Sequence, residues 1–262
     1  MKVRLISAAV ALLILIPLLF VGGIPFAIVI GIIAVLGYKE IIDLKKHHNE
    51  IPNVVKVLGL LCLLYIVLGE YDINSLDTIN YAKILLPLIL LLIPTVFYKN
   101  NKYSTKDALY LVGSIFLLGV FLNLILTIRV INFDLLIYLL AIPILTDTFA
   151  YMIGMLIGKH KMCPTISPKK SWEGAIGGLI GGSAIALIIY TNIVGDFSIK
   201  LLLVTIILSI VGQIGDLVYS KIKRENDIKD FSNLMPGHGG ILDRIDSLTF
   251  VILTYMALIW FI

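Results

Sequence analysis

Long apolar stretches alternate with short polar segments along the whole chain. Most of these stretches could cross about 30 Å of hydrocarbon as a helix, which takes roughly 20 residues. The segments between them are too short to form a separate extramembrane domain. The pattern therefore predicts an all-α, polytopic integral membrane protein that forms a single domain over residues 1–262. About nine transmembrane helices are expected, at 4–21, 24–42, 53–71, 82–99, 105–129, 133–158, 172–194, 198–220 and 240–262.

Composition supports this class. Hydrophobic residues make up 59% of the chain and charged residues only 15%, which is too apolar for a soluble globular domain. No nucleic-acid partner is expected. Cys62 and Cys163 lie far apart and show neither zinc-site nor disulfide spacing, so both are expected to be free thiols. The first two spans are joined only by residues 22–25, so this pair is also compatible with a re-entrant hairpin.

The distribution of Lys and Arg predicts the orientation in the membrane. Basic residues are concentrated at and after the C-terminal ends of the even-numbered spans. They are Lys39, Lys45 and Lys46, then Lys99, Lys102 and Lys106, then Lys159, Lys161, Lys169 and Lys170, and finally Lys221, Lys223, Arg224 and Lys229. The corresponding positions of the odd-numbered spans carry only Lys83, Arg129 and Lys200. Cytoplasmic loops are enriched in Lys and Arg, so we expect a cytoplasmic N-terminus and an external C-terminus. A multi-pass protein of a bacterial inner membrane fits this pattern.

Four carboxylates lie within or at the ends of the spans, where an ionisable group costs about 2.5–3.5 kcal/mol to insert. They are Asp147, Asp216, Asp243 and Asp246. All lie toward the expected cytoplasmic side, on three helices, which indicates one polar cavity. Clustered carboxylates repel one another unless a cation lies among them, and their oxygens suit Mg²⁺. The alternative is neutralisation by local ion pairs, such as Asp243 or Asp246 with Arg244 or Lys223.

Two loops add groups that suit phosphate binding. Residues 237–240 read Gly-His-Gly-Gly ahead of the last span, where exposed amides and a helix N-terminus favour an anion. Residues 167–173 place a Lys pair between two serines at the start of span 172–194. Trp172 suits either stacking on a base or anchoring at the interface. The plain alternatives are a helix-initiating loop and a cytoplasmic positively charged loop.

The span 172–194 is rich in glycine. Gly174, Gly178 and Gly182 recur every four residues, with Gly177 and Gly181 beside them. Small residues at this spacing allow two helices to approach closely in lipid. We therefore expect this face to pack tightly against a neighbouring helix.

At these polar segments the sequence resembles the phosphatidate cytidylyltransferase family, also called CDP-diacylglycerol synthases. The family pattern is Ser-x-x-Lys-Arg, four residues, Lys-Asp, then Pro-x-His-Gly-Gly, two residues, Asp-Arg, one residue and Asp. It is met by Ser220, Lys223, Arg224, Lys229, Asp230, Pro236, His238, Gly239, Gly240, Asp243, Arg244 and Asp246. Residues 146–151, 167–174 and 215–216 also resemble the family. The N-terminal spans match only in being hydrophobic helices.

The resemblance implies transfer of CMP from CTP to phosphatidate with Mg²⁺, in a homodimer with a cavity open to the cytoplasm and the lipid. It implies that residues 131–262 carry the catalytic helices and that 1–130 serve as scaffold or in dimerisation. The catalytic residues would be Asp216, Lys223, Arg224, Asp243, Arg244 and Asp246, with metal held by Asp216, Asp243 and Asp246. The substrate-binding residues would be Asp147, Ser167, Lys169, Lys170, Ser171, Ser220, Lys229, His238, Gly239 and Gly240. The phosphate of phosphatidate is already anionic, so His238 is not needed as a general base.

Two other functions stay open at this point. A CTP-dependent enzyme could act on a different lipid, such as an isoprenoid ether phosphatidate or a polyprenol. An ion-coupled transporter would also use intramembrane acids, although it would be expected to show repeated halves, and this sequence shows no repeat. The acyl-chain preference and the presence of a second, monovalent cation are left open as well.

Overall fold

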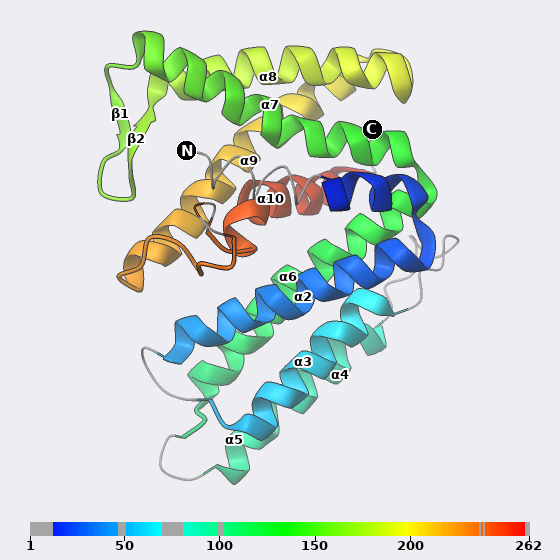
Figure 1. The fold of residues 1–262 in the computed structure, drawn as a ribbon, viewed down its shortest axis with the longest axis vertical. Coiled ribbons are helices and arrows are strands. Elements are labelled where there is room, and N and C mark those ends of the chain that lie inside the picture. The colour runs from blue at the N-terminus through cyan, green and yellow to red at the C-terminus, as the bar shows by residue number, and fades with distance from the viewer. Residues whose placement is uncertain are drawn as a thin grey trace. The chain divides into compact units, whose positions relative to one another are not determined.

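The computed structural model describes residues 13–46, 51–69, 81–98, 102–235, 237 and 239–259. Within these residues the regular structure is helical apart from one short β-hairpin (Figure 1). A helix over 13–21 is followed by the labelled elements. These are α2 (Gly23–Lys46), α3 (Asn53–Leu68), α4 (Tyr81–Leu92), α5 (Pro94–Phe97), α6 (Thr105–Ile131), α7 (Phe133–Ile157), β1 (Lys161–Cys163), β2 (Ser167–Ser171), α8 (Trp172–Ile193), α9 (Ile199–Glu225) and α10 (Leu242–Leu258).

The all-α membrane fold is confirmed, while the count of nine crossings is not. Five described helices are long and apolar enough to span a membrane, namely α2, α6, α7, α8 and α9. Residues 53–68 and 82–97 form shorter apolar helices, the second interrupted before Pro94. Span 4–21 is described only from residue 13 onward. A helix therefore lies at every expected span, but its length does not always suffice for a crossing.

Two boundaries differ from the sequence prediction. The segment 158–173 was expected to be a loop, but it contains β1 and β2 paired antiparallel. The expected span 198–220 continues as α9 to Glu225, so Lys223 and Arg224 lie on a helix. Basic residues in a last turn interact favourably with the negative end of the helix dipole, which explains the extension. The predicted span ended at residue 220 because the residues that follow are mostly polar and do not continue the apolar pattern.

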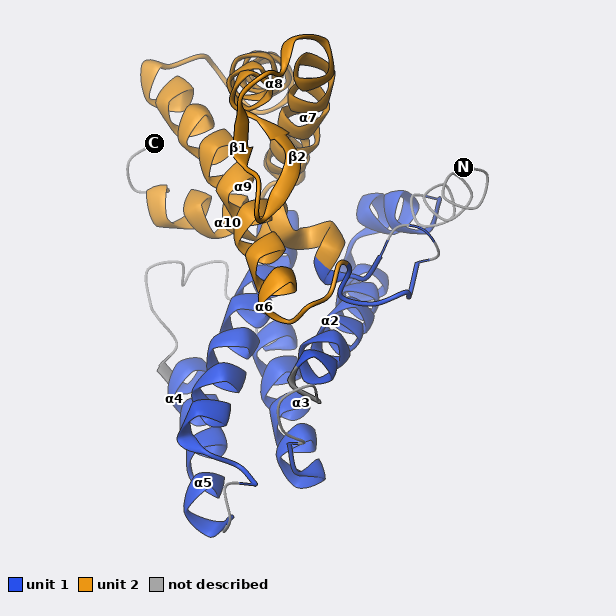
Figure 2. Ribbon diagram, turned by 90° about the vertical axis from the view of Figure 1, so that its left-hand side faces the viewer, with its two compact units in different colours: residues 1–131, 230–242 blue, residues 132–229, 243–262 orange. Residues whose placement is uncertain are grey.

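The chain divides into two compact units, coloured separately in Figure 2. Unit 1 comprises residues 1–131 and 230–242, and unit 2 comprises 132–229 and 243–262. In unit 1, α2, α3, α4 and α6 lie side by side around a core that includes the fully buried Leu63, Ile115 and Phe121. The segment 230–242 thus belongs with the N-terminal helices, although it follows α9 in the sequence.

In unit 2, α7 and α8 pack with their backbones in close contact, as the glycine spacing predicts. A Cβ added at Gly178 would lie 2.6 Å from the carbonyl oxygen of Thr146, and one at Gly182 would lie 2.7 Å from Thr146 Cα. No larger side chain fits there without separating the helices. The Tyr138 and Thr205 hydroxyls, 2.6 Å apart, join α7 to α9. The hairpin lies where α7 ends and α8 begins (Figure 1).

Candidate active site

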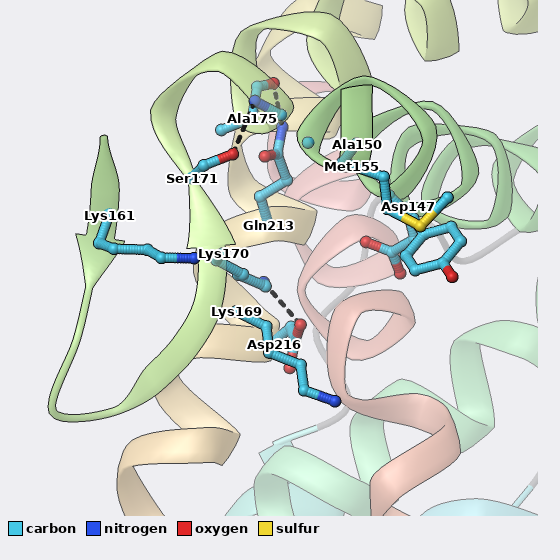
Figure 3. Close-up of a pocket in the computed structure, with 13 residues that line it drawn as sticks. Asp147, Ala150, Met155, Lys161, Lys169, Lys170, Ser171, Ala175, Gln213 and Asp216 are labelled. Atoms are coloured by element: carbon cyan, nitrogen blue, oxygen red, sulfur yellow. Dashed lines mark hydrogen bonds and ion pairs between the residues drawn. The ribbon is translucent and has the colours of Figure 1, made fainter. Parts of the chain in front are cut away.

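A cavity of about 430 Å³ opens in unit 2 among α7, the hairpin, α8 and α9 (Figure 3). Its wall combines glycine and alanine surfaces with a small set of polar side chains. The polar set is Asp147, Lys161, Lys169, Lys170, Gln213 and Asp216, together with the Ser171 hydroxyl and the Tyr151 ring. Lys161 and Lys170 extend from the hairpin, and the Asp147 carboxylate faces them from α7 (Figure 3). Of the residues predicted to share one polar cavity, Asp147, Asp216 and the Lys169–Lys170 pair do line this one.

An ion pair connects the hairpin to α9 inside this cavity. The Lys170 Nζ lies 2.6 Å from Asp216 Oδ2, and the two side chains are 26% and 24% exposed. The Ser220 hydroxyl, one turn further along α9, donates to Asp216 Oδ1 at 3.2 Å. Asp216 and Ser220 thus share one helix face, as their spacing of four predicts.

Three of the four acids lie close enough to interact. The Asp147, Asp216 and Asp246 carboxylates are close enough to repel one another, and a nearby lysine partly offsets this repulsion at Asp147 and at Asp246. They come from α7, α9 and α10, so only tertiary packing brings them together. Lys170 attracts Asp147, and Lys223 attracts Asp246. A cluster of carboxylates of this kind attracts cations.

The fourth acid, Asp243, forms a buried ion pair. Its Oδ1 lies 2.6 Å from the Lys223 Nζ, and the two side chains are 3% and 10% exposed. The sequence left open whether an ion pair with Lys223 or Arg244 neutralises Asp243. The structure shows the pair with Lys223. Arg244 is exposed. Lys223 and Asp243 therefore have a structural contact in addition to the catalytic roles that the family resemblance implies.

The hairpin that carries the lysines is held at its base by Glu173. This carboxylate accepts hydrogen bonds from the backbone N–H groups of Lys159 and His160, each at 3.2 Å, and contacts the His160 ring nitrogen Nδ1. The Ser171 hydroxyl caps α8 by accepting from Gly174 N at 3.2 Å. Ser171, expected to bind substrate, is thus both a helix cap and part of the cavity wall.

The remaining predicted residues are distributed around this site or belong to the other unit. Ser167 lies on β2, and Lys229 is exposed. Arg224 donates to the carbonyl groups of Ile166 and Ile228, which connects α9 to the turn of the hairpin. Gly239 and Gly240 are buried in unit 1, and His238 lies outside the described residues.

Some contributors were missed or underrated. Gln213 lies one turn before Asp216 on α9, lines the cavity, and donates from Nε2 to the Ala175 carbonyl at 3.3 Å. Its position three residues before Asp216 was the only signal in the sequence. Lys161 was interpreted as an ordinary charged loop residue, but it lines the cavity. Its strand pairing with Ser171 places it beside the other lysines.

The sequence also predicted that the N-terminus of the last helix binds a substrate anion. In the structure, the N–H groups of Ile241 and Leu242 donate to the carboxylate of Glu40. The anion at this position is therefore a group of the protein itself. The proposed phosphate contacts of Gly239 and Gly240 remain a prediction.

The described residues contain no group of three or more His, Cys, Asp or Glu side chains arranged to hold a metal ion. Magnesium commonly binds through one or two carboxylates, with substrate phosphates completing its shell. Asp216 and Asp246 supply hard oxygen donors of that type. The donor chemistry of this site thus fits Mg²⁺ that arrives together with a nucleotide.

Comparison with known proteins identifies the family. The model of the cytidylyltransferase family matches residues 2–262. This chain belongs to the cytidylyltransferase family. Proteins named phosphatidate cytidylyltransferase from Staphylococcus haemolyticus and Staphylococcus saprophyticus are 37% and 36% identical to it, each over 96% of both chains. The protein of that name from Staphylococcus aureus is 35% identical over 254 residues, again 96% of both chains.

The match extends the resemblance beyond the motifs that suggested it. Those motifs cover roughly the C-terminal half of this cytidylyltransferase, whereas the family model begins at residue 2. The helices of unit 1 are therefore part of the family fold. They are not a separate hydrophobic addition to a catalytic half.

Proposed function

We propose that this cytidylyltransferase transfers CMP from CTP to phosphatidate, giving CDP-diacylglycerol and pyrophosphate in phospholipid biosynthesis. The observation that carries the proposal is the cavity of unit 2, where Lys161, Lys169 and Lys170 meet Asp147 and Asp216. An apolar membrane protein gathers charges of both signs at high cost unless they serve a ligand. Two phosphate-bearing substrates and a divalent cation are such a ligand set. The names of the relatives favour phosphatidate over another lipid acceptor.

The reaction needs positioning and charge neutralisation more than proton transfer. An oxygen of the phosphatidate phosphate attacks the α-phosphorus of CTP, and the bond from that phosphorus to the bridging β-oxygen breaks to release pyrophosphate. The attacking oxygen is already ionised, so no side chain has to remove a proton. Lys161, Lys169 and Lys170 would attract the phosphates and hold the attacking and leaving oxygens in line. The apolar part of the wall would exclude water, the competing acceptor.

The acids would serve the cation. Asp216 and Asp246 would hold Mg²⁺, which supplies charge stabilisation at the phosphate oxygens when it is bound. Asp147 adds negative charge nearby, and Lys170 would exchange its contact with Asp216 for a substrate phosphate. Asp243 stays a predicted third ligand, although Lys223 engages it in this structure.

We place the reaction at the cytoplasmic face of the cell membrane. The alternation of Lys and Arg between loops supports this orientation, and CTP is a cytoplasmic metabolite. Homodimer formation is implied only by the family resemblance and stays a prediction.

The proposal is tested by determining which phosphate of CTP is transferred to the lipid. Purified protein in detergent is incubated with Mg²⁺, phosphatidate and CTP labelled in either the α- or the γ-phosphate. Only the α-label should become lipid-soluble, and only when phosphatidate is present. Transfer of γ-label, with release of CDP, would indicate a lipid kinase and refute the proposal.

A pair of lysine variants connects the activity to the cavity. Lys170→Met removes a lining ammonium, and a phosphate contact of this kind is worth about 100-fold in rate. Lys159→Met is the matched control, because Lys159 is exposed beside the same hairpin and does not line the cavity. Equal activity of the two variants would exclude the cavity as the place of reaction.

A further inference from the structure

A buried carboxylate on α2 is bound to the segment that precedes the last helix. Glu40 is 4% exposed, although the helix around it is largely apolar. Its Oε1 accepts hydrogen bonds from Ser232 Oγ at 2.7 Å and from Ile241 N at 2.8 Å. Its Oε2 accepts from Leu242 N at 2.9 Å. All four residues belong to unit 1.

These donors explain why a carboxylate is tolerated in the core. The first N–H groups of a helix have no partner within the helix, and the positive end of the helix dipole favours an anion. Glu40 satisfies the N–H groups at residues 241 and 242 at the start of α10. Hydrogen bonds to an ionised acceptor are stronger than neutral ones. The cap comes from about 200 residues away in the sequence.

The two adjacent glycines of the Gly-His-Gly-Gly segment meet separate requirements of this arrangement. Gly239 has a φ of +84° and forms hydrogen bonds in both directions with Met235, at 3.0 and 3.2 Å. Gly240 lies against Glu40, and a Cβ at this position would overlap the carboxylate. The first glycine therefore makes the turn, and the second leaves space for Glu40.

We propose that Glu40 is a positioning residue for the transfer reaction. It holds segment 232–242 in one conformation and determines the residue at which α10 begins, without itself touching substrate. This inference rests on the proposed function, because the segment carries the predicted phosphate-binding glycines and leads directly into Asp243 and Asp246. Asp243 and Asp246 lie one and four residues beyond Leu242, the first residue of α10, so movement of the helix start would displace both acids directly.

The chain offers a matched control in the same unit. Asp107 is also a buried carboxylate, 3% exposed, at the start of a helix. It accepts from Ser104 N at 2.9 Å and from Ser104 Oγ at 2.7 Å. Asp107→Asn therefore removes a buried helix-capping charge of the same kind, at a loop with no predicted role in catalysis. Glu40→Gln and Asp107→Asn are comparable in the charge they remove and in burial, while Asp107 accepts only from its neighbour Ser104.

The two variants are compared by thermal unfolding, by hydrogen exchange and by steady-state kinetics. Both should lower the melting temperature. Only Glu40→Gln should speed amide exchange over 232–242, and only it should lower kcat, by about 10- to 100-fold at equal folded fraction, because small misplacements of reacting groups cost this much. Ser232→Ala, which removes one of the three donors, should have a smaller effect in the same direction.

Two results would overturn the proposal. One is a kcat for Glu40→Gln that falls no further than that of Asp107→Asn, and the other is unchanged exchange over 232–242. An inactive wild-type protein would instead refute the proposed function. In that case the exchange data would still decide whether Glu40 holds the segment.

Discussion

Replacing Asp243 by Asn tests the contribution of its buried ion pair to the stability of the fold. The change removes the negative charge from a pair whose atoms lie 2.6 Å apart and whose side chains are 3% and 10% exposed. Breaking a buried pair by removing one partner costs about 3–5 kcal/mol. The asparagine oxygen can still accept one hydrogen bond from Lys223, and Asp246 also attracts this lysine. We therefore expect a loss of about 2 kcal/mol in the free energy of unfolding.

The assay is a thermal unfolding curve of the helical circular dichroism in detergent micelles. For chains of about this size, 1 kcal/mol corresponds to roughly 2–4 °C, so the melting temperature should fall by roughly 4–8 °C. The double variant Lys223→Met/Asp243→Asn removes both charges of this pair, and it should regain about 1 kcal/mol relative to Asp243→Asn alone. A single variant that melts like the wild type, or a double variant that is no more stable than the single one, would refute this account of the pair.

Three further predictions concern the acid cluster, the packing of α8 and the orientation in the membrane. Asp246→Asn should lower activity by at least about 100-fold without lowering the melting temperature, because it relieves repulsion among three carboxylates; a fall in melting temperature like that of Asp243→Asn would contradict this. Gly178→Val should destabilise the protein by about 1–3 kcal/mol or prevent folding, since its Cβ would lie 2.6 Å from the Thr146 carbonyl oxygen. Gly113→Ala, on α6 with no atom within 4 Å of the added Cβ, is its control and should be tolerated. Reporter fusions after Lys46, Lys102, Lys161 or Lys229 should be cytoplasmic and a fusion at the C-terminus external; an external reporter after Lys229 would contradict the expected orientation.

The fold class could be predicted from the sequence because membrane helices are defined locally. A run of apolar residues of sufficient length must satisfy its backbone hydrogen bonds within itself, so it forms a helix whatever its neighbours are. The glycine spacing of α8 was equally local, and it correctly predicted close packing against another helix. Neither signal identified α7 as the partner.

The sequence predicted most of the residues that form the candidate site, but only some of the contacts between them. Asp147, Asp216 and Lys170 were singled out from their position and do line one cavity. Lys161 was underrated, because its approach to the cavity depends on the pairing of β1 with β2. For Asp243, the sequence allowed either a metal or an ion pair. Only the structure shows the buried contact with Lys223.

The sequence by itself determined which segments are helices, which residues are costly to bury, and which chemistry those residues suit. These properties depend on side-chain type and on spacing along the chain. The tertiary structure alone decided which charges meet, because a contact such as that of Glu40 with Ile241 joins residues 201 positions apart. Spacing along the chain carries no information about such a distance. A lone glutamate in an apolar helix therefore has no visible partner until the helices are packed.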